Sequence, residues 1–377
     1  MAPTPDDLPD PTQIEGAPHP RDTPRLIGHA AAEREFLTAF TAGRLHHGWL
    51  ITGPGGVGKA TLAWRLARFL LATPDDDGGM FAAPAPTTLH IPADHPVARR
   101  IAAQSESRLF HLKRGVNSTG SALSDDIRVD EVRKLKSFFT LSAADGGRRV
   151  AIVDSADELA TAGANALLKL LEEPPERVTL LLISHQPHRL LPTIRSRCRM
   201  LRLGPLSPTD LSEALAQAGG VVEPGQAQAL AELAGGSVGE AFRLTNLDGL
   251  DVYGRLLALM ATLPRLDRPR LLTMADQVAG KANGARFDLT LTLLDLFLAR
   301  LARTGSVGQP PPAAARDEPA LLARLSPNPA AARHWADLAQ TLGAKARRGR
   351  AVNLDPSALL MDMVLAIDAA AGALAQR

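Results

Sequence analysis

A glycine-rich stretch that ends in a lysine is the part of this sequence best suited to chemistry. It reads Gly53-Pro54-Gly55-Gly56-Val57-Gly58-Lys59. Glycines let backbone N–H groups turn toward an anion, and the lysine of such a loop meets the β- and γ-phosphates of a nucleotide. The start of the following helix adds positive potential. The stretch predicts a phosphate-binding loop whose contacts come from Gly53, Gly55, Gly56, Gly58 and Lys59.

The residue that ligates Mg²⁺ in such loops is missing from this one. Ala60 stands where the motif has a serine or threonine. Thr61 comes one residue late, about 100° further round the helix. We keep Thr61 among the candidate nucleotide-binding positions, but its placement does not suit the usual metal ligand.

A second candidate motif follows the apolar run 150–153. Asp154 comes next, at the usual place for a carboxylate that holds Mg²⁺ through water. The residue after it, where related ATPases carry the glutamate that activates water, is Ser155. A serine hydroxyl cannot act as a general base near neutral pH without its own activator. Asp157 and Glu158 lie further along, and we expect them to solvate the next turn or cap a helix.

Short apolar runs alternate with helical patterns around these motifs. Runs 47–52, 149–153 and 178–183 are rich in apolar, β-branched residues, as in buried parallel strands. Helix formers fill 165–172 and stop at Pro174-Pro175. A helix after the lysine would turn Leu62, Leu66, Phe69 and Leu70 inward. The alternation predicts a doubly wound α/β domain.

The rest of the chain divides by composition. Residues 1–24 are rich in proline and aspartate, which predicts a disordered tail. Gly204-Pro205 marks a boundary, after which Ser207 resembles a helix N-cap with Pro208 in the first turn. Residues 207–246 are expected to form a small helical unit. From residue 247 the pattern is helical to the end, with a buried helix over 287–301 and a loop over 305–319.

Composition excludes several kinds of protein. The formal charge is only +2, so net charge gives no reason to expect strong autonomous nucleic-acid binding. The single cysteine, Cys198, forbids an internal disulfide and is expected to be a small buried hydrophobe rather than a nucleophile. The sequence shows no leader pattern and no evident apolar run of membrane-spanning length, so we expect a cytoplasmic protein.

Several stretches of the sequence carry a family resemblance. Residues 150–154 with Ala164-Asn165-Ala166-Leu167-Leu168-Lys169-Leu170-Leu171-Glu172-Glu173-Pro174-Pro175 resemble the clamp-loader branch of AAA+ proteins. So does the Ser196-Arg197-Cys198 triplet. Stretches 26–29 and 43–49 are similar to the delta-prime family of bacterial DNA polymerase III clamp-loader subunits. The resemblance covers residues 26–244 well, whereas beyond them it depends on helical character and on Asn353-Leu354-Asp355.

The resemblance implies a three-part fold. An AAA+ α/β domain with a parallel sheet is expected over 25–205, a small helical lid over 206–246 and an all-α collar over 247–377. The family implies a hetero-pentameric ring with motor subunits and a delta subunit, which loads a sliding clamp onto primed DNA. It also implies that Arg197 acts in trans, as the arginine finger of a neighbouring motor subunit.

The resemblance also shows what this chain lacks. Gly239 occupies the place of the lid arginine of a motor subunit, and Arg243 lies one turn further on. Ser184 or His185 occupies the first sensor position. Together with Ala60 and Ser155 in the two phosphate-site motifs, these changes predict no autonomous ATPase, although bound ATP or ADP stays open.

Zinc is not expected. Many clamp-loader subunits carry a four-cysteine zinc module after the phosphate-loop helix, but residues 75–106 hold no cysteine. His90 and His95 in this stretch are expected at the surface.

Two other functions remain in view. The first is a working AAA+ ATPase, either a motor-type clamp-loader subunit or a helicase loader, against which Ala60, Ser155 and Gly239 count. The second is a nucleic-acid-binding module, supported by the basic run Lys345, Arg347, Arg348 and Arg350. We expect that run to be a solvated helix end. ATP turnover or salt-sensitive DNA binding by the isolated protein would distinguish them.

Overall fold

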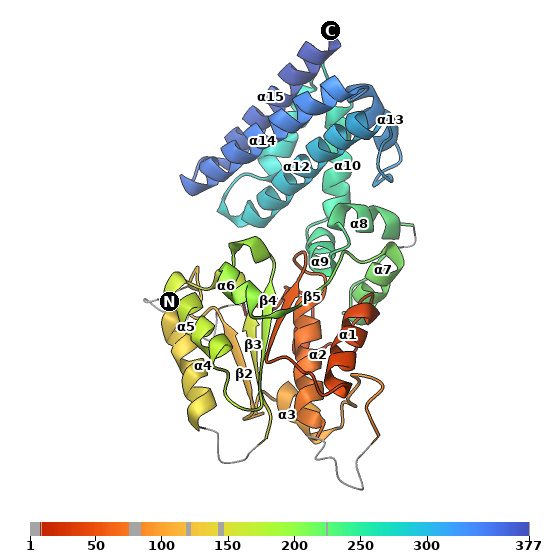
Figure 1. The fold of residues 1–377 in the computed structure, drawn as a ribbon. Helices are drawn as coiled ribbons and strands as arrows, with labels where there is room; N and C mark the ends of the chain where they lie inside the picture. Colours follow the sequence, from red (N-terminus) through yellow and green to blue (C-terminus); the bar gives the residue numbers. More distant parts are fainter. Residues whose placement is uncertain are drawn as a thin grey trace. The chain divides into compact units, whose positions relative to one another are not determined.

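The chain folds into two compact units in the computed structural model (Figure 1), which describes residues 8, 10–74, 84–117, 122–141, 147–223 and 225–376. The first unit comprises Met1–Val221 with Gly236–Gly239, and the second comprises Val222–Gly235 with Glu240–Arg377. The first is an α/β unit and the second is built of helices.

The α/β unit contains a five-stranded parallel sheet in the order β2-β3-β4-β1-β5. Its strands are β1 (Gly48–Thr52), β2 (Leu109–Lys113), β3 (Arg149–Asp154), β4 (Val178–Ser184) and β5 (Arg199–Arg202). All residues of β1, β3 and β4 are buried, as expected for central parallel strands covered on both faces. The predicted parallel α/β architecture is confirmed.

Helices cover both faces of this sheet, as Figure 1 shows. They are α1 (Ala30–Thr41), α2 (Lys59–Ala72), α3 (Pro96–Ala102), α4 (Val129–Leu141), α5 (Thr161–Glu172), α6 (Pro192–Ser196) and α7 (Pro208–Gln217), with short 3-10 turns η2 (Pro20–Asp22), η4 (Ala156–Glu158) and η5 (Pro187–Arg189). Side chains of β3 alternate between two cores. Val150 and Ile152 pack with α1, α2 and α3, whereas Ala151 and Val153 pack with α4, α5 and α6.

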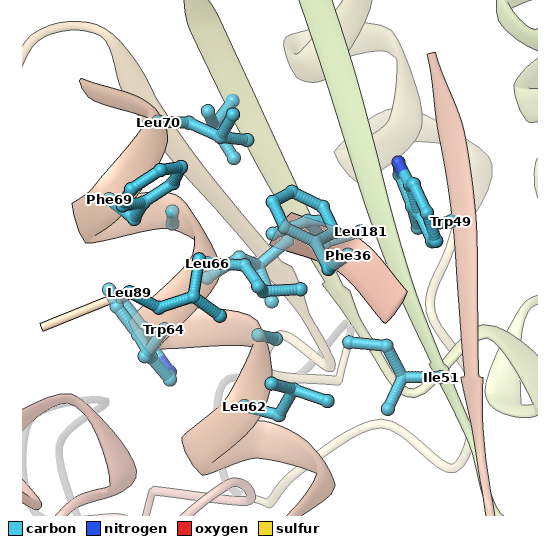
Figure 2. Packing of buried hydrophobic residues seen from close by; sticks show 14 of the residues in the cluster. Phe36, Trp49, Ile51, Leu62, Trp64, Leu66, Phe69, Leu70, Leu89 and Leu181 are labelled. Atoms are coloured by element: carbon cyan, nitrogen blue, oxygen red, sulfur yellow. The ribbon is translucent and has the colours of Figure 1, made fainter. Parts of the chain in front are cut away.

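The core under α2 holds the phosphate loop in place. Leu62, Leu66, Phe69 and Leu70 are at most 1% exposed and face β1 and β4, as predicted from their spacing (Figure 2). Trp49 of β1 lies in the same core. The strand before the loop and the helix after it are therefore both anchored by apolar packing.

Several elements of this unit were not predicted, among them β2 and α4. β2 lies at the sheet edge, and its sequence Leu-Phe-His-Leu-Lys mixes polar and apolar residues. α4 begins at Val129 and packs against α5. The predicted helix 165–172 begins earlier, at Thr161. Ser207 caps α7 as expected, because its hydroxyl accepts a 3.1 Å hydrogen bond from the N–H of Asp210.

The N-terminal segment differs from the predicted disordered tail from Asp10 onward. His19 is only 3% exposed, and its ring packs edge-on against Trp64 with 5.6 Å between the centroids. Asp10 forms an ion pair with Lys113. These anchors supply burial and charge pairing that the Pro/Asp-rich composition does not indicate. Residues 1–7 and 9 of the predicted tail lie outside the described residues.

The second unit is built of the helices from α8 onward. The set is α8 (Ala227–Ala234), α9 (Val238–Asn246), α10 (Gly249–Met260), α11 (Arg268–Gln277), α12 (Gly284–Val307), α13 (Glu318–Leu325), α14 (Pro329–Ala351) and α15 (Pro356–Ala375), with the 3-10 turn η6 (Lys281–Asn283). α12 contains the predicted buried helix and packs along α14. The predicted loop 305–319 is shorter, because α12 continues to Val307 and α13 begins at Glu318.

Contacts divide the predicted lid between the two units. α7 groups with the α/β unit, whereas α8 and residues from Glu240 onward group with the helical unit. The division into α/β domain, lid and collar therefore stays a prediction.

A buried ion pair joins two helices of the helical unit. Glu318 is 0% exposed, and its carboxylate accepts hydrogen bonds from Arg300 Nε at 2.6 Å and from the Tyr253 hydroxyl. Burial raises the pKa of Tyr253, and the Glu318 charge adds to this shift. The sequence analysis places Glu318 in a loop and does not predict this pair.

The last helix corrects one expectation. Among the helices of the described chain, α15 alone has the length and apolar composition to cross a membrane. Its residues Leu360, Val364 and Ile367 are fully buried within the helical unit, where α15 packs on α11 and α14. This burial is typical of a core helix. Length and composition alone do not exclude a membrane-spanning helix here, contrary to the sequence expectation.

Candidate functional site

The predicted phosphate loop connects β1 to α2 with the backbone geometry that its glycines allow. Gly56 and Gly58 have φ angles of 70° and 104°, which side chains other than glycine rarely adopt. The backbone carbonyl of Val57 lies 2.8 Å from His29 Nε2. Burial lowers the pKa of His29. The buried His29 ring therefore holds the loop through the carbonyl of Val57.

Lys59 is the first residue of α2 and is only 3% exposed. Its ammonium group donates hydrogen bonds to the carbonyls of Gly53, at 2.8 Å, and Pro54. Burial lowers the pKa of Lys59 to about 8, and the carboxylates of Asp154 and Asp157 oppose that shift. The lysine is thus bound to the carbonyls of its own loop.

Residues 236–239 pack directly on the phosphate loop. The N–H of Gly239 donates to the carbonyl of Gly56 at 3.3 Å. A Cβ added at Gly56 would lie 2.4 Å from Ser237 Oγ and 2.8 Å from the nitrogen of Gly239. A Cβ added at Gly239 would lie 3.2 Å from the Cα of Gly56. The two backbones come this close because both Gly56 and Gly239 lack a side chain.

The acidic motif ends β3 beside the loop. Asp154 is 7% exposed, and its backbone pairs in register with Lys113 of β2. Burial raises the pKa of Asp154 to about 7, and the nearby charge of Glu158 adds to that effect. A carboxylate with this pKa is a weaker metal ligand near neutral pH, because part of the population is protonated.

The residue at the water-activating position is engaged elsewhere. The hydroxyl of Ser155 lies 2.9 Å from Nε2 of His185, which follows β4. Burial lowers the pKa of His185, with the Lys59 charge adding. Sequence reasoning missed this pairing, because it depends on how β3 and β4 align. Asp157 accepts hydrogen bonds from the N–H groups of His185 and Gln186, which agrees with the expected turn-solvating role.

The sensor candidates have separate environments. Ser184 ends β4 opposite Thr52, is 0% exposed, and its hydroxyl has no hydrogen-bond partner among the described residues. His185 contacts Ser155 instead. Arg243, one turn beyond Gly239, forms a 2.6 Å ion pair with Glu240 and a 3.1 Å hydrogen bond to Thr292 within the helical unit. Ala60 packs against the α2 core, and Thr61 is half-buried.

Arg197 lies at the N-terminal end of the parallel strands, whereas the phosphate loop lies at their C-terminal end. It ends α6 just before β5, and β5 begins at Arg199, which pairs with Trp49 near the start of β1. The loop follows Thr52, the last residue of β1. The guanidinium of Arg197 is 38% exposed and makes a 3.0 Å ion pair with Glu172 at the end of α5.

The remaining sequence candidates are also placed. Burial raises the pKa of Cys198 to about 12, which agrees with an unreactive thiol. His95 caps α3 by accepting from the N–H of Val97, and His90 is exposed. Within the described ranges no group of three His, Cys, Asp or Glu side chains could hold a metal. Part of the zinc-module region, residues 75–83, lies outside those ranges.

Two residues of the basic run of α14 form ion pairs within the helical unit. Lys345 forms an ion pair with Asp362, and Arg350 one of 2.8 Å with Asp288. This pairing agrees with a solvated helix end.

Comparison with known proteins finds a family match within the α/β unit. Residues 28–207, slightly less than half of the chain, match the family model described as DNA polymerase III, delta subunit. Over 152 residues the chain is 38% identical to the DNA polymerase III subunit delta' of Pseudomonas aeruginosa, covering 40% of this chain and 41% of that protein.

Similarity to a second type of subunit is broader and weaker. The chain is 29% identical over 273 residues to the DNA polymerase III subunit tau of Escherichia coli, covering 70% of this chain and 39% of that protein. The matched stretches thus span less than half the length of these relatives. Among solved structures, a gamma subunit-related protein from Thermotoga maritima matches 88% of this chain and 98% of its own at 18% identity and a TM-score of 0.36.

Proposed function

We propose that this chain is a delta-prime-like clamp-loader subunit of DNA polymerase III, which helps to load the sliding clamp onto primed DNA. In this proposal it does not turn over ATP and instead completes the ATPase site of a neighbouring motor subunit. The family match of residues 28–207 supports the assignment to DNA polymerase III. The similarity to delta' supports the choice of subunit.

The chemistry of its own site supports the loss of turnover. Ala60 has no oxygen to offer Mg²⁺, so the metal lacks its loop ligand. The hydroxyl of Ser155 is held by His185 and cannot replace a glutamate as general base. The backbone of Gly239 packs on Gly56, where the family places a lid arginine. All three changes remove parts that act on the transferring phosphoryl group.

The trans role of Arg197 is supported by one observation. Arg197 lies at the end of the parallel strands opposite its own phosphate loop. β1 separates the two by four residue steps, which is about 13 Å of extended strand. An arginine finger must contact the phosphoryl oxygens directly. This separation supports a role for Arg197 at another molecule rather than at its own loop.

Glu172 supports the same role by holding the guanidinium in place. Their 3.0 Å ion pair is half-exposed, since the two side chains are 38% and 42% exposed. Such pairs contribute less than about 1 kcal/mol, so a stronger anion can displace the carboxylate. The polyphosphate of a neighbour's nucleotide is such an anion, and a fork-shaped guanidinium can contact two of its oxygens.

The partners follow from the same proposal. The helical unit from Glu240 onward supplies the collar contacts to motor subunits and to delta in a hetero-pentameric ring. Sliding clamp and primed DNA are reached through the assembled complex, in the cytoplasm.

The deciding experiment is reconstitution of that complex with Arg197→Ala. Normal assembly with lost ATP turnover supports the proposal. Unchanged turnover contradicts the finger role, and turnover by the isolated chain favours a working ATPase.

A further inference from the structure

The N-terminal segment makes contacts next to the degenerate site. We call residues 10–19 the strap. Its first turn is fixed internally, because the Asp10 carboxylate accepts from the N–H and hydroxyl of Thr12 at 3.0 and 2.7 Å. A second turn closes where the N–H of Ala17 donates to the carbonyl of Ile14 at 3.0 Å. The strap thus has a defined local conformation.

The start of the strap is anchored beside the acidic motif. Asp10 forms an ion pair with Lys113, the last residue of β2, whose backbone aligns with Asp154 in β3. The strap therefore begins beside the end of β3, where the metal and phosphates of a nucleotide would bind.

The middle of the strap contacts the residues that cover the phosphate loop. A Cβ added at Gly239 would lie 2.7 Å from Ile14 Cδ1 and 3.2 Å from the Cα of Gly56. Ile14 and Gly56 therefore flank Gly239 closely. A side chain at position 239 would therefore have to displace the end of the Ile14 side chain.

The end of the strap is anchored in the core. His19 contacts Trp64 of α2 and His111 of β2, with centroid distances of 5.6 and 6.3 Å. Trp64 itself belongs to the core under α2 (Figure 2). The strap is thus fixed at both ends, with Ile14 between the anchors.

We propose that the strap is an intramolecular ligand of the degenerate site, which takes the place of nucleotide. It holds the β2–β3 edge and residues 236–239 together around the phosphate loop and excludes ATP and ADP. Residues 10–19 of this chain join these parts, so their contacts do not depend on ATP.

The test is equilibrium binding of a fluorescent ADP analogue to the isolated full-length chain. The parent is expected to show no saturable binding. Asp10→Ala/Ile14→Ala releases the first anchor and the Gly239 contact, and is expected to bind the analogue saturably, with a Kd at least about tenfold below the highest concentration tested on the parent, a difference of at least about 1.4 kcal/mol. Adding Lys59→Ala should abolish that gain, because the lysine is the phosphate contact.

Two further variants make the result specific. The side-chain amide of Gln13 donates an exposed hydrogen bond to the carbonyl of Ala17, within the strap. Gln13→Ala should therefore bind the analogue like the parent. Asp10→Asn removes one charge with minimal change in shape and should give a smaller gain, which protects the test if the double variant does not fold. Equal binding by parent and strap variants, or a gain that survives Lys59→Ala, overturns the proposal. The assay contains no partner subunit and does not measure the action of Arg197 on a neighbour, so its failure leaves the proposed function untouched.

Discussion

The N–H of Gly239 donates a hydrogen bond to the carbonyl of Gly56, so residue 239 is in direct contact with the phosphate loop. The contact needs glycine on both sides. A larger side chain at position 239 would displace both Ile14 and the loop backbone.

Two neighbouring glycines test this contact directly. Gly56→Ala places a Cβ 2.4 Å from Ser237 Oγ and requires a side chain at φ 70°. We expect it to lower the free energy of unfolding by about 1 to 3 kcal/mol. Gly55→Ala, with nothing within 4 Å of its added Cβ, should change it by less than about 0.5 kcal/mol. Urea unfolding measures both, and equal effects would contradict the packing described.

The isolated chain should release no phosphate from ATP above the buffer background. Ala60 and Ser155 leave the metal and the attacking water without their usual contacts. A phosphate-release assay with Mg²⁺ checks this. Turnover that disappears on Lys59→Ala would show a working site and favour the ATPase alternative.

Acid should weaken the strap through His19. Burial lowers the pKa of His19 to about 4 from an ordinary 6.5, and Arg21 adds to the shift. The unfolded state therefore takes up the proton first, and this contribution to stability is lost as pH falls from about 6.5 toward 4. The charged or titratable groups around the ring are Asp10, Arg21, Asp22, His111 and Lys113.

His19→Asn isolates that effect. Asparagine keeps an acceptor for the N–H of Arg21 but does not titrate in this range. Between pH 7.5 and pH 5 the parent should lose about 1 to 2 kcal/mol of unfolding free energy relative to the variant. Using the difference removes the opposite pH dependence of Asp154, whose raised pKa favours stability at low pH. Parallel pH profiles would contradict the burial of a neutral His19.

The buried pair in the helical unit gives a stability prediction. Glu318→Gln leaves the Arg300 guanidinium, 6% exposed, without its main carboxylate, and should cost about 3 kcal/mol. Glu213→Gln removes a carboxylate whose ion pair with Arg25 is exposed, and should cost less than about 1 kcal/mol. Chemical denaturation compares the two. A small effect of Glu318→Gln would show that the pair contributes little.

Local patterns were sufficient to predict the phosphate loop and its flanking elements. Gly53 to Lys59 determine the turn by themselves, and the apolar spacing of α2 follows from burial. Contacts between distant segments were not accessible in this way. The Ser155–His185 pair spans 30 residues and depends on the β3–β4 register, and Glu318 meets Arg300 only after α12 and α13 pack.

Composition did not predict the structure at either end of the chain. Pro- and Asp-rich sequence predicted disorder around Asp10, yet an ion pair and a buried ring hold that segment. The apolar α15 drew no attention in the sequence, yet it has membrane-like length and packs as a core helix. Average composition does not report which few side chains find partners.

The central claim is that Arg197 acts on a neighbour, and ATP turnover by the reconstituted clamp-loader complex tests it most directly. Arg197→Ala should leave the complex assembled by gel filtration, because a 38% exposed arginine carries little packing. A finger in trans is worth roughly 10³ to 10⁵ in rate at the site it completes. Turnover at that site and clamp loading should therefore fall sharply, Lys should rescue poorly, and Arg99→Ala, another exposed arginine, should have no effect. An assembled Arg197→Ala complex with parental turnover and clamp loading would contradict the account.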